Sequence, residues 1–269
     1  MRQLRGKNAL LTGASRGLGP YLARTLAAEG VNLALSATRL ESIQELAASL
    51  EQEGVKATPL TADFTVAPDV ASLAERAEEA LQGIDILVNN AGIESEGLFM
   101  EQDPDTIIRT VRVNCTAPMR LTHLLLPAMV RRGEGHIVNM SSIAGKRGAP
   151  YDAIYSGTKA ALIEWGNALR MELADTGVFV STICPGYVTE VGMFARFGID
   201  PPRLIGSCTP QQVAAATVRA IKLQQPEVIV NSRPLRPLLA FGQLFPTVAD
   251  RMLRAAGIPA FQKRKVGRG

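Results

Sequence analysis

Residues 8–19 read NALLTGASRGLG, and this stretch decides the fold. The pattern of a short buried strand (8–11) runs into a turn that holds three glycines, and a helical pattern begins at Leu18. Glycine is needed where a chain turns tightly and where its backbone approaches a pyrophosphate, which the N–H groups of the next helix attract. The glycines alone are a weak signal, but strand, turn and helix together predict a dinucleotide-binding unit.

Short apolar runs alternate with longer helical patterns along the rest of the chain. Runs such as IDILVN (84–89) and VFVSTI (178–183) are apolar on both faces, which is typical of buried parallel strands. The alternation predicts one doubly wound α/β Rossmann domain, a parallel seven-stranded sheet with helices on both faces. We expect strands at 8–11, 32–36, 56–61, 84–89, 136–140, 178–183 and 227–230, and helices at 18–29, 40–53, 67–81, 105–131 (interrupted near Pro118 and Pro127), 153–174 and 211–222.

The charge of the chain is unevenly distributed. The formal net charge is +4, but residues 233–269 carry +7, from eight basic residues against Asp250, so the rest of the chain sums to −3. A solvated basic tail is one interpretation, and contact with an anionic surface, such as membrane phosphate or an acidic partner, is the other. The eight are Arg233, Arg236, Arg251, Arg254, Lys263, Arg264, Lys265 and Arg268.

Several classes of protein are disfavoured by composition. Cys115, Cys184 and Cys208 are widely spaced and form no CxxC, so, with no signal peptide in view, we expect a reducing, cytoplasmic location. No apolar run is long enough to span a membrane. With two histidines and no cysteine cluster we expect no metal, and we expect no nucleic-acid partner.

The glycine turn also matches a hydrolase motif. Gly13 to Gly17 spell GxSxG, the nucleophile elbow of α/β hydrolases, with Ser15 as the nucleophile. Such an elbow needs a histidine downstream, yet none follows His136, and only twelve residues precede Gly13 to supply an oxyanion hole. The hydrolase is therefore the weaker alternative.

A second cluster of chemistry lies at Ser142, Tyr155 and Lys159. Tyr155 and Lys159 are four residues apart on a predicted helix and share one face. A nearby ammonium would lower the pKa of the phenol, which could then work as a general acid and base on an alcohol oxygen. Taken alone, the same pair is common on helix surfaces.

Together these motifs resemble the short-chain dehydrogenase/reductase family over residues 6–232. The matching features are TGxxxGxG (12–19), NNAG (89–92), Ser142, YxxxK (155–159) and Pro185-Gly186, in the family's order. The resemblance implies an oxidoreductase with strand order 3-2-1-4-5-6-7, assembled as a homodimer or homotetramer. A dinucleotide sensor without catalysis is a further alternative, which the intact Ser142, Tyr155 and Lys159 disfavour.

The resemblance also assigns roles to residues. It implies that Tyr155 is the acid/base, that Lys159 lowers its pKa and binds the nicotinamide ribose, that Ser142 orients the carbonyl and that Asn114 holds a relay water. Where the family often has threonine, this chain has Glu190, which puts the contact with the carboxamide in doubt. The implied cofactor-binding residues are Gly13, Ser15, Arg16, Gly17, Leu18, Gly19, Thr38, Arg39, Asp63, Phe64, Asn90, Ala91, Gly92, Tyr155, Lys159, Pro185, Gly186 and Val188.

The end of the second strand predicts which nicotinamide cofactor is bound. An acid there would bind the ribose 2′-hydroxyl of NAD, whereas this chain reads Leu35 to Arg39 as LSATR, with no acid before Glu41. Arg16 and Arg39 could hold a 2′-phosphate by charge-assisted hydrogen bonds. We therefore predict NADP(H). Carbonyl reduction is the expected direction because cells usually keep NADP reduced, and the residues themselves do not set it.

The last third of the chain is expected to shape the substrate site. We place the catalytic domain at 1–232, an apolar substrate lid at about 189–210 and a helical extension with a basic tail at 233–269. An apolar lid favours an apolar ketone, with 3-oxoacyl compounds among the candidates. The alternative is that the apolar side chains of the lid pack on the protein itself or on a neighbouring subunit. Phe241, Leu244, Phe245, Val248 and Met252 have helical spacing, so this stripe either packs over the cleft or a dimer partner, or dips into a membrane surface.

Overall fold

The computed structural model describes residues 1–202 and 204–267, so Arg203 and the tail residues Arg268 and Gly269 lie outside the described residues. The strand β1 (Asn8–Thr12) leads through the glycine turn into α1 (Gly19–Ala28), as the sequence predicts. The next elements are β2 (Asn32–Ala37), α2 (Glu41–Gln52), β3 (Ala57–Thr61), α3 (Ala67–Leu81) and β4 (Ile86–Asn89).

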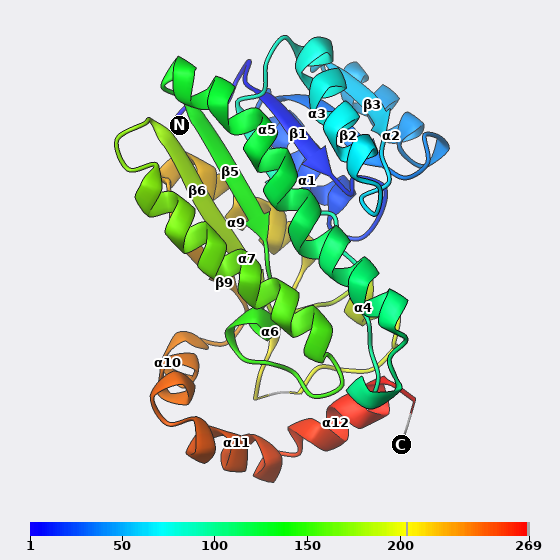
Figure 1. Cartoon of the computed structure of the whole chain (residues 1–269), viewed down its shortest axis with the longest axis vertical. Helices are drawn as coiled ribbons and strands as arrows, with labels where there is room; N and C mark the ends of the chain where they lie inside the picture. Colours follow the sequence, from blue (N-terminus) through cyan, green and yellow to red (C-terminus); the bar gives the residue numbers. More distant parts are fainter. Residues whose placement is uncertain (203, 268–269) are drawn as a thin grey trace.

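A parallel seven-stranded sheet forms the centre of the molecule (Figure 1). Its later strands are β5 (Gly135–Met140), β6 (Val178–Pro185) and β9 (Glu227–Val230). The order is β3-β2-β1-β4-β5-β6-β9, so the predicted order 3-2-1-4-5-6-7 is confirmed, with β9 as the seventh strand. The order in which the strands are added changes direction between β1 and β4, which pair in parallel, and ligands of such sheets bind outside the carboxyl ends of the strands at this point.

Helices cover both faces of the sheet and enclose two apolar layers. Leu22 of α1, Ile43 of α2 and Val213 of α9 (Pro210–Leu223) are buried in one layer. Leu73 of α3 and Leu121 of α5 (Ala117–Arg132) belong to the other layer, which also includes α7 (Ala153–Glu172). This burial on both sides explains why the strand sequences are almost uniformly apolar.

The predicted helix at 105–131 is three elements. The helix α4 (Pro104–Val111) passes through a π-helical turn, Arg112–Thr116, into α5 (Ala117–Arg132). Pro118 lies in the first turn of α5, where its missing N–H is tolerated, and Pro127 lies inside the helix. The π turn carries Asn114, and such turns are frequent at functional sites.

Short elements after β5 surround the carboxyl edge of the sheet. They are α6 (Ile143–Lys146), β7 (Tyr187–Val188), α8 (Gly192–Ala195) and β8 (Ser207–Cys208), of which β7 and β8 form a small sheet that the sequence did not predict. A 3₁₀ turn, Phe99–Glu101, precedes α4.

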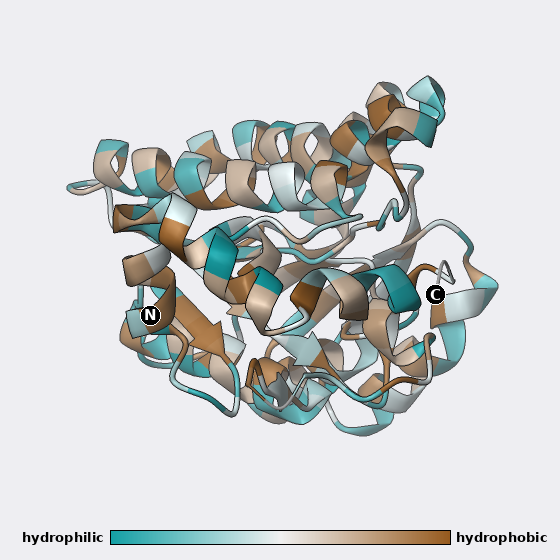
Figure 2. Cartoon of the chain, turned by 90° about the horizontal axis from the view of Figure 1, so that it is seen from below, coloured by the Kyte–Doolittle hydropathy of each residue, from teal (hydrophilic) through white to brown (hydrophobic). Residues whose placement is uncertain are grey.

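Three helices form an arc below this edge: α10 (Arg236–Leu244), α11 (Pro246–Ala255) and α12 (Ile258–Lys265) (Figure 1). Seen from below, the helices of the chain carry a mixture of hydrophilic and hydrophobic residues (Figure 2). A proline lies in the first turn of each of these helices: Pro237, Pro246 and Pro259. Most of the apolar stripe does not cover the cleft, because Leu244, Phe245 and Val248 are exposed, whereas Met252 lines the cavity at the carboxyl edge of the sheet. Among the described residues, no helix has both the length and the apolar character to cross a membrane.

Candidate active site

A cavity of about 1500 Å³ lies at the carboxyl edge of the sheet, between the glycine turn and the C-terminal arc. It is larger than the ~300–1,000 Å³ of most small-molecule sites, so it has room for two ligands. The predicted site residues that line it are Gly13, Ser15, Arg16, Gly17, Leu18, Thr38, Asp63, Phe64, Asn90, Ala91, Gly92, Ser142, Tyr155, Lys159, Pro185, Gly186 and Val188. Gly19, Arg39 and Asn114 are not among the lining residues.

The glycine turn is locked to the neighbouring strand. The Thr12 hydroxyl accepts hydrogen bonds from the backbone N–H groups of Asn90 and Ala91, and Asn90 Nδ2 donates to the carbonyls of Thr12 and Gly13 at 3.0 Å. Gly13 has a φ of +67°, and a Cβ there would lie 2.8 Å from Ala91 Cα. The turn can therefore be this tight only with glycine at position 13.

The end of β2 presents basic groups and no acid. Arg16 and Arg39 are exposed, and within the described part of the chain no hydrogen bond or ion pair engages either guanidinium. Thr38 lines the cavity beside them. Asp63 instead is held by Thr65, whose N–H and hydroxyl donate to it at 2.8 and 2.7 Å and lower the pKa of this carboxyl.

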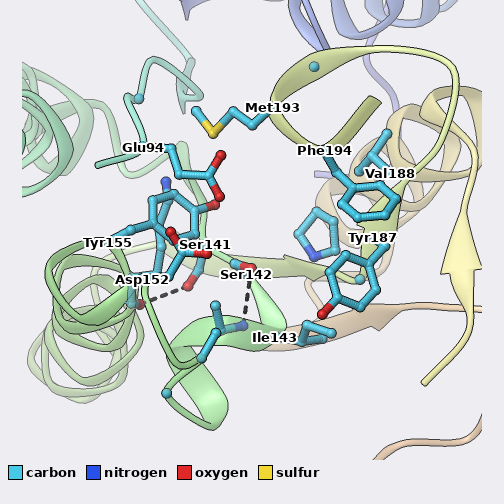
Figure 3. Close-up of a pocket in the computed structure, with 18 of the residues that line it drawn as sticks. Glu94, Ser141, Ser142, Ile143, Asp152, Tyr155, Tyr187, Val188, Met193 and Phe194 are labelled. Carbon is cyan, nitrogen blue, oxygen red and sulfur yellow. Dashed lines mark hydrogen bonds between the residues drawn. The ribbon is translucent and has the colours of Figure 1, made fainter. Parts of the chain in front are cut away.

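Ser142, Tyr155 and Lys159 all line the cavity, and Figure 3 shows Ser142 and Tyr155 on the same side of it. Ser142 caps α6, since its hydroxyl accepts from the N–H of Ala144 at 3.1 Å, and it also forms a hydrogen bond with Tyr155. Lys159 is buried one turn further along α7, where its Nζ donates to the Met140 carbonyl at 2.8 Å. The same Nζ lies 5.5 Å from the centre of the Tyr155 ring.

The pKa of Tyr155 differs from the sequence prediction. Lys159 was expected to lower it, but in the structure the pKa is raised, because burial disfavours the phenolate and the Glu94 carboxylate repels it. The hydrogen bond with Ser142 acts in the opposite direction without reversing the shift. Burial also lowers the pKa of Lys159 to about 8. Burial and the Glu94 carboxylate therefore keep the Tyr155 phenol protonated at neutral pH.

Asn114 is fixed between the β4 loop and α7. Its Oδ1 accepts from the Ile93 N–H at 2.9 Å, and its Nδ2 donates to the Ile93 carbonyl at 2.8 Å and to the Thr158 hydroxyl at 3.0 Å. Gly92 lies beside it, so close that an added Cβ would be 3.4 Å from both Asn114 Oδ1 and Lys159 Nζ. The water-holding role of Asn114 stays a prediction.

The loop after β6 has an unusual backbone conformation at the position where its sequence departs from the family pattern. Glu190 is exposed and has a φ of +73°, which is uncommon for a residue with a side chain. Thr189 is held by the Cys208 carbonyl, which accepts from its N–H at 3.0 Å. Gly186 packs so tightly that a Cβ would lie 2.2 Å from Asn231 Oδ1.

The cavity beyond Tyr155 is also lined by Glu94 and Tyr187, which the sequence did not single out as site residues. Glu94 faces Tyr155 and has Met193 beside it, whereas Tyr187, Val188 and Phe194 form an apolar side across from them (Figure 3). Lys265 from the basic tail is buried here, which contradicts a wholly solvated tail. Glu94 lies two residues beyond the NNAG motif, and that position is the one sequence signal for it.

The hydrolase alternative finds no support in this geometry. Among the described residues no histidine lines the cavity that contains Ser15. His136 is buried in β5, with its Nε2 2.8 Å from the Ser181 hydroxyl, and His123 is exposed on α5.

Comparison with known proteins agrees with the motifs. The family model for short chain dehydrogenases matches residues 7–200. The chain is 41% identical to ketoacyl reductase HetN of Nostoc sp. over 98% of its own length and 94% of the relative's. It is 33% identical to dehydrogenase/reductase SDR family member 7B of Bos taurus, over 92% of this chain and 82% of that one.

Solved structures show the same fold. A short-chain dehydrogenase from Sphingobium yanoikuyae in complex with NADPH has a TM-score of 0.78 and 30% identity, and the match covers 91% of this chain and 95% of that one. An actinorhodin polyketide ketoreductase variant with NADPH has a TM-score of 0.76 and 29% identity, with 86% and 98% covered.

Proposed function

The chain belongs to the short-chain dehydrogenase family, as its motifs predicted, and from that premise we propose that this oxidoreductase reduces an apolar ketone with NADPH. The observation that carries the proposal is that Ser142, Tyr155 and Lys159 share one cavity with the glycine turn. Bound NADPH would supply a hydride to the carbonyl carbon. The protein must then supply a proton and hold the carbonyl oxygen.

Tyr155 is suited to give that proton. Burial and the Glu94 carboxylate raise the pKa of the phenol above its usual value, so the hydroxyl remains a proton donor at neutral pH. A donor of this kind serves reduction, in which a ketone oxygen gains a proton, rather than alcohol oxidation, which needs a base. Ser142, hydrogen-bonded to the phenol, would share the carbonyl oxygen and fix its orientation.

The groups around β2 support NADP(H) as the cofactor. Arg16 and Arg39 are free to pair with a 2′-phosphate, and no acid stands at the end of β2 to bind a 2′-hydroxyl. Gly13 and Gly17 line the cavity without side chains, which fits close approach of the backbone to a pyrophosphate. The solved relatives with NADPH are consistent with this choice.

An apolar substrate, with a 3-oxoacyl compound as the leading candidate, is supported by the cavity wall. Tyr187, Met193, Phe194, Leu239 and Leu253 line the end beyond Tyr155, and apolar walls with few polar groups favour lipophilic ligands. The relative HetN is named a ketoacyl reductase. Buried, free thiols at Cys115, Cys184 and Cys208 fit a reducing, cytoplasmic location.

Two outer surfaces suggest partners. The exposed Ile108, Val111 and Leu124 of α4 and α5 support a homo-oligomer. The exposed Phe245 and Val248 of the C-terminal arc, beside Arg251 and Arg254, support contact with an anionic membrane. Sedimentation with phosphatidylserine vesicles tests the membrane contact, and equal sedimentation after Phe245→Ser/Val248→Ser would exclude this face.

The deciding experiment for the reaction is NADPH oxidation with a series of ketones. We expect turnover of N-acetylcysteamine thioesters from 3-oxobutanoyl to 3-oxododecanoyl, with kcat/KM rising with chain length. Tyr155→Phe is the blank, since it keeps the ring and removes the proton donor. If the protein bound NADPH tightly but none of the carbonyl compounds led to NADPH oxidation, the result would instead support a dinucleotide sensor.

A further inference from the structure

Lys265, near the end of α12, is buried among three carboxyl groups at the substrate end of the cavity. Its Nζ lies 2.8 Å from Glu94 Oε1, 2.9 Å from Glu96 Oε1 and 2.8 Å from Asp152 Oδ2, and 4% of its side chain is exposed. Burial of an ammonium is costly without such partners. The ion pairs therefore favour one position of α12 over the cavity.

A second cation, from the predicted substrate lid, forms ion pairs with two of the same carboxyl groups. Arg196, just after α8, lies 3.0 Å from Glu96 Oε2 and 3.4 Å from Glu94 Oε2. Both segments that cover the substrate end are thus attached to one cluster, which we call the carboxyl cluster (Glu94, Glu96 and Asp152). The cluster would suit a metal ion by its ligand types, but the Lys265 ammonium occupies it.

The charges of the carboxyl cluster are close to balance. Burial and the neighbouring Asp152 raise the pKa of Glu94 to about 8, and burial raises that of Asp152. One proton retained at neutral pH leaves two negative charges against Lys265 and Arg196. Tyr155 and Tyr187 also face this region, and burial keeps both phenols neutral by raising their pKa.

Other contacts link the position of α12 to that of β7 and α8. Gln262 Nε2 donates to the Tyr187 hydroxyl at 2.9 Å. The Phe261 ring lies 5.8 Å from that of Tyr187 and 6.4 Å from that of Phe194. A shift of α12 would therefore move the apolar wall opposite Tyr155.

We propose that Lys265 is a positioning residue that sets substrate selectivity: by docking in the carboxyl cluster it fixes α12 and the apolar wall that a long-chain ketone would contact. The selectivity rests on the proposed function, whereas the docking of α12 does not. Lys265 is not expected to touch the reacting atoms. Its loss should affect the binding of long substrates more than the hydride transfer.

Limited trypsin digestion tests the docking without any substrate. Lys265→Met removes the ammonium and keeps the length of the side chain, and Lys263→Met on the exposed side of α12 is the matched control. We expect cleavage after Arg251 and Arg254 to be at least about tenfold faster in Lys265→Met, since breaking a buried ion pair is strongly destabilising, and unchanged in Lys263→Met. Equal rates in the two variants would overturn the docking.

Kinetics then test the selectivity. In Lys265→Met we expect the KM of a 3-oxodecanoyl thioester to rise at least about tenfold, while the KM values of NADPH and of the 3-oxobutanoyl thioester change less than about threefold. The defect should shrink from about pH 8 to about pH 6, because protonation removes buried negative charge that has lost its partner. Equal losses for both chain lengths at every pH would overturn the proposal.

A double variant distinguishes the loss of the ion pairs from general misfolding of the Lys265→Met protein. Lys265→Met/Asp152→Asn removes one of the stranded carboxylates, so we expect it to recover part of the protease resistance and of the long-chain KM. No recovery would contradict the ion-pair explanation. If the wild-type protein reduces no ketone, the proposed function fails, but the trypsin comparison still decides whether Lys265 docks α12.

Discussion

At position 13 both the backbone conformation and the packing require glycine. Replacing it with alanine would place a Cβ 2.8 Å from Ala91 Cα and 3.1 Å from Ala91 N, at a φ of +67°. Both contacts are with backbone, which Asn90 and the Thr12 hydroxyl hold in place. The strain of the left-handed conformation costs ~1–2 kcal/mol, and forcing an extra methyl group into packed structure adds ~1–3 kcal/mol.

We therefore expect Gly13→Ala to lower the free energy of unfolding by about 2–5 kcal/mol. A loss of about 3 kcal/mol would move the urea midpoint down by about 1 M if m is about 3 kcal/mol/M. The assay is urea unfolding of the cofactor-free protein. NADPH affinity, measured next by titration calorimetry, should fall as well, because the turn can no longer approach the β4 loop.

Gly54→Ala is the matched control. Gly54 has a φ of +89°, and nothing lies within 4 Å of the position of an added Cβ. The Gly54→Ala substitution should therefore cost only the conformational strain of ~1–2 kcal/mol, because the added Cβ meets no atom. If Gly13→Ala destabilised the protein no more than Gly54→Ala, the reasoning about the glycine turn and the β4 loop would be refuted.

Three further predictions address the cofactor, the proton donor and acid stability. Arg39→Ala should raise the KM for NADPH far more than that for NADH; equal effects in steady-state assays would remove the proposed 2′-phosphate contact. Tyr155→Phe should lower kcat by about 10²–10⁴-fold while NADPH still binds in calorimetry, and near-wild-type turnover would exclude Tyr155 as the proton donor. Burial lowers the pKa of His136 to about 3, below its unfolded value of 6.5, so the folded state resists protonation that the unfolded state accepts. Stability should fall as the pH drops through 6.5, by about 2 kcal/mol at about pH 5, in urea titrations. His136→Gln should flatten this dependence; an unchanged slope would assign it to other groups.

Local pattern was enough to predict most of the fold. Strands buried on both faces have uniformly apolar sequences, as in 84–89, and the glycine turn has a conformation that few other residues can adopt. The spacing of Tyr155 and Lys159 placed both on one face of α7 because the helical period is local. The strand order came from the family resemblance, since pairing between distant strands has no local signature.

Features that depend on distant packing were not predictable. The π turn at Arg112–Thr116 has no distinctive composition, and β7 and β8 are too short to show a pattern. The stripe at 241–252 has helical spacing, but spacing does not say that its apolar side faces outward. The pKa of Tyr155 was predicted in the wrong direction because helical spacing contains no measure of burial.

Two buried lysines in the same cavity have pKa values that are shifted in opposite directions by their surroundings. For Lys159, burial outweighs distant charges and lowers the pKa to about 8. For Lys265, burial also acts to lower the pKa, but the carboxyls of Glu94 and Asp152 together outweigh it and raise the pKa. Lys265 is thus charged at any physiological pH and bound to the protein's own carboxyls, which suits a fixed attachment. Lys159 is the lysine whose charge can respond to its surroundings, because no carboxylate is paired with it among the described residues.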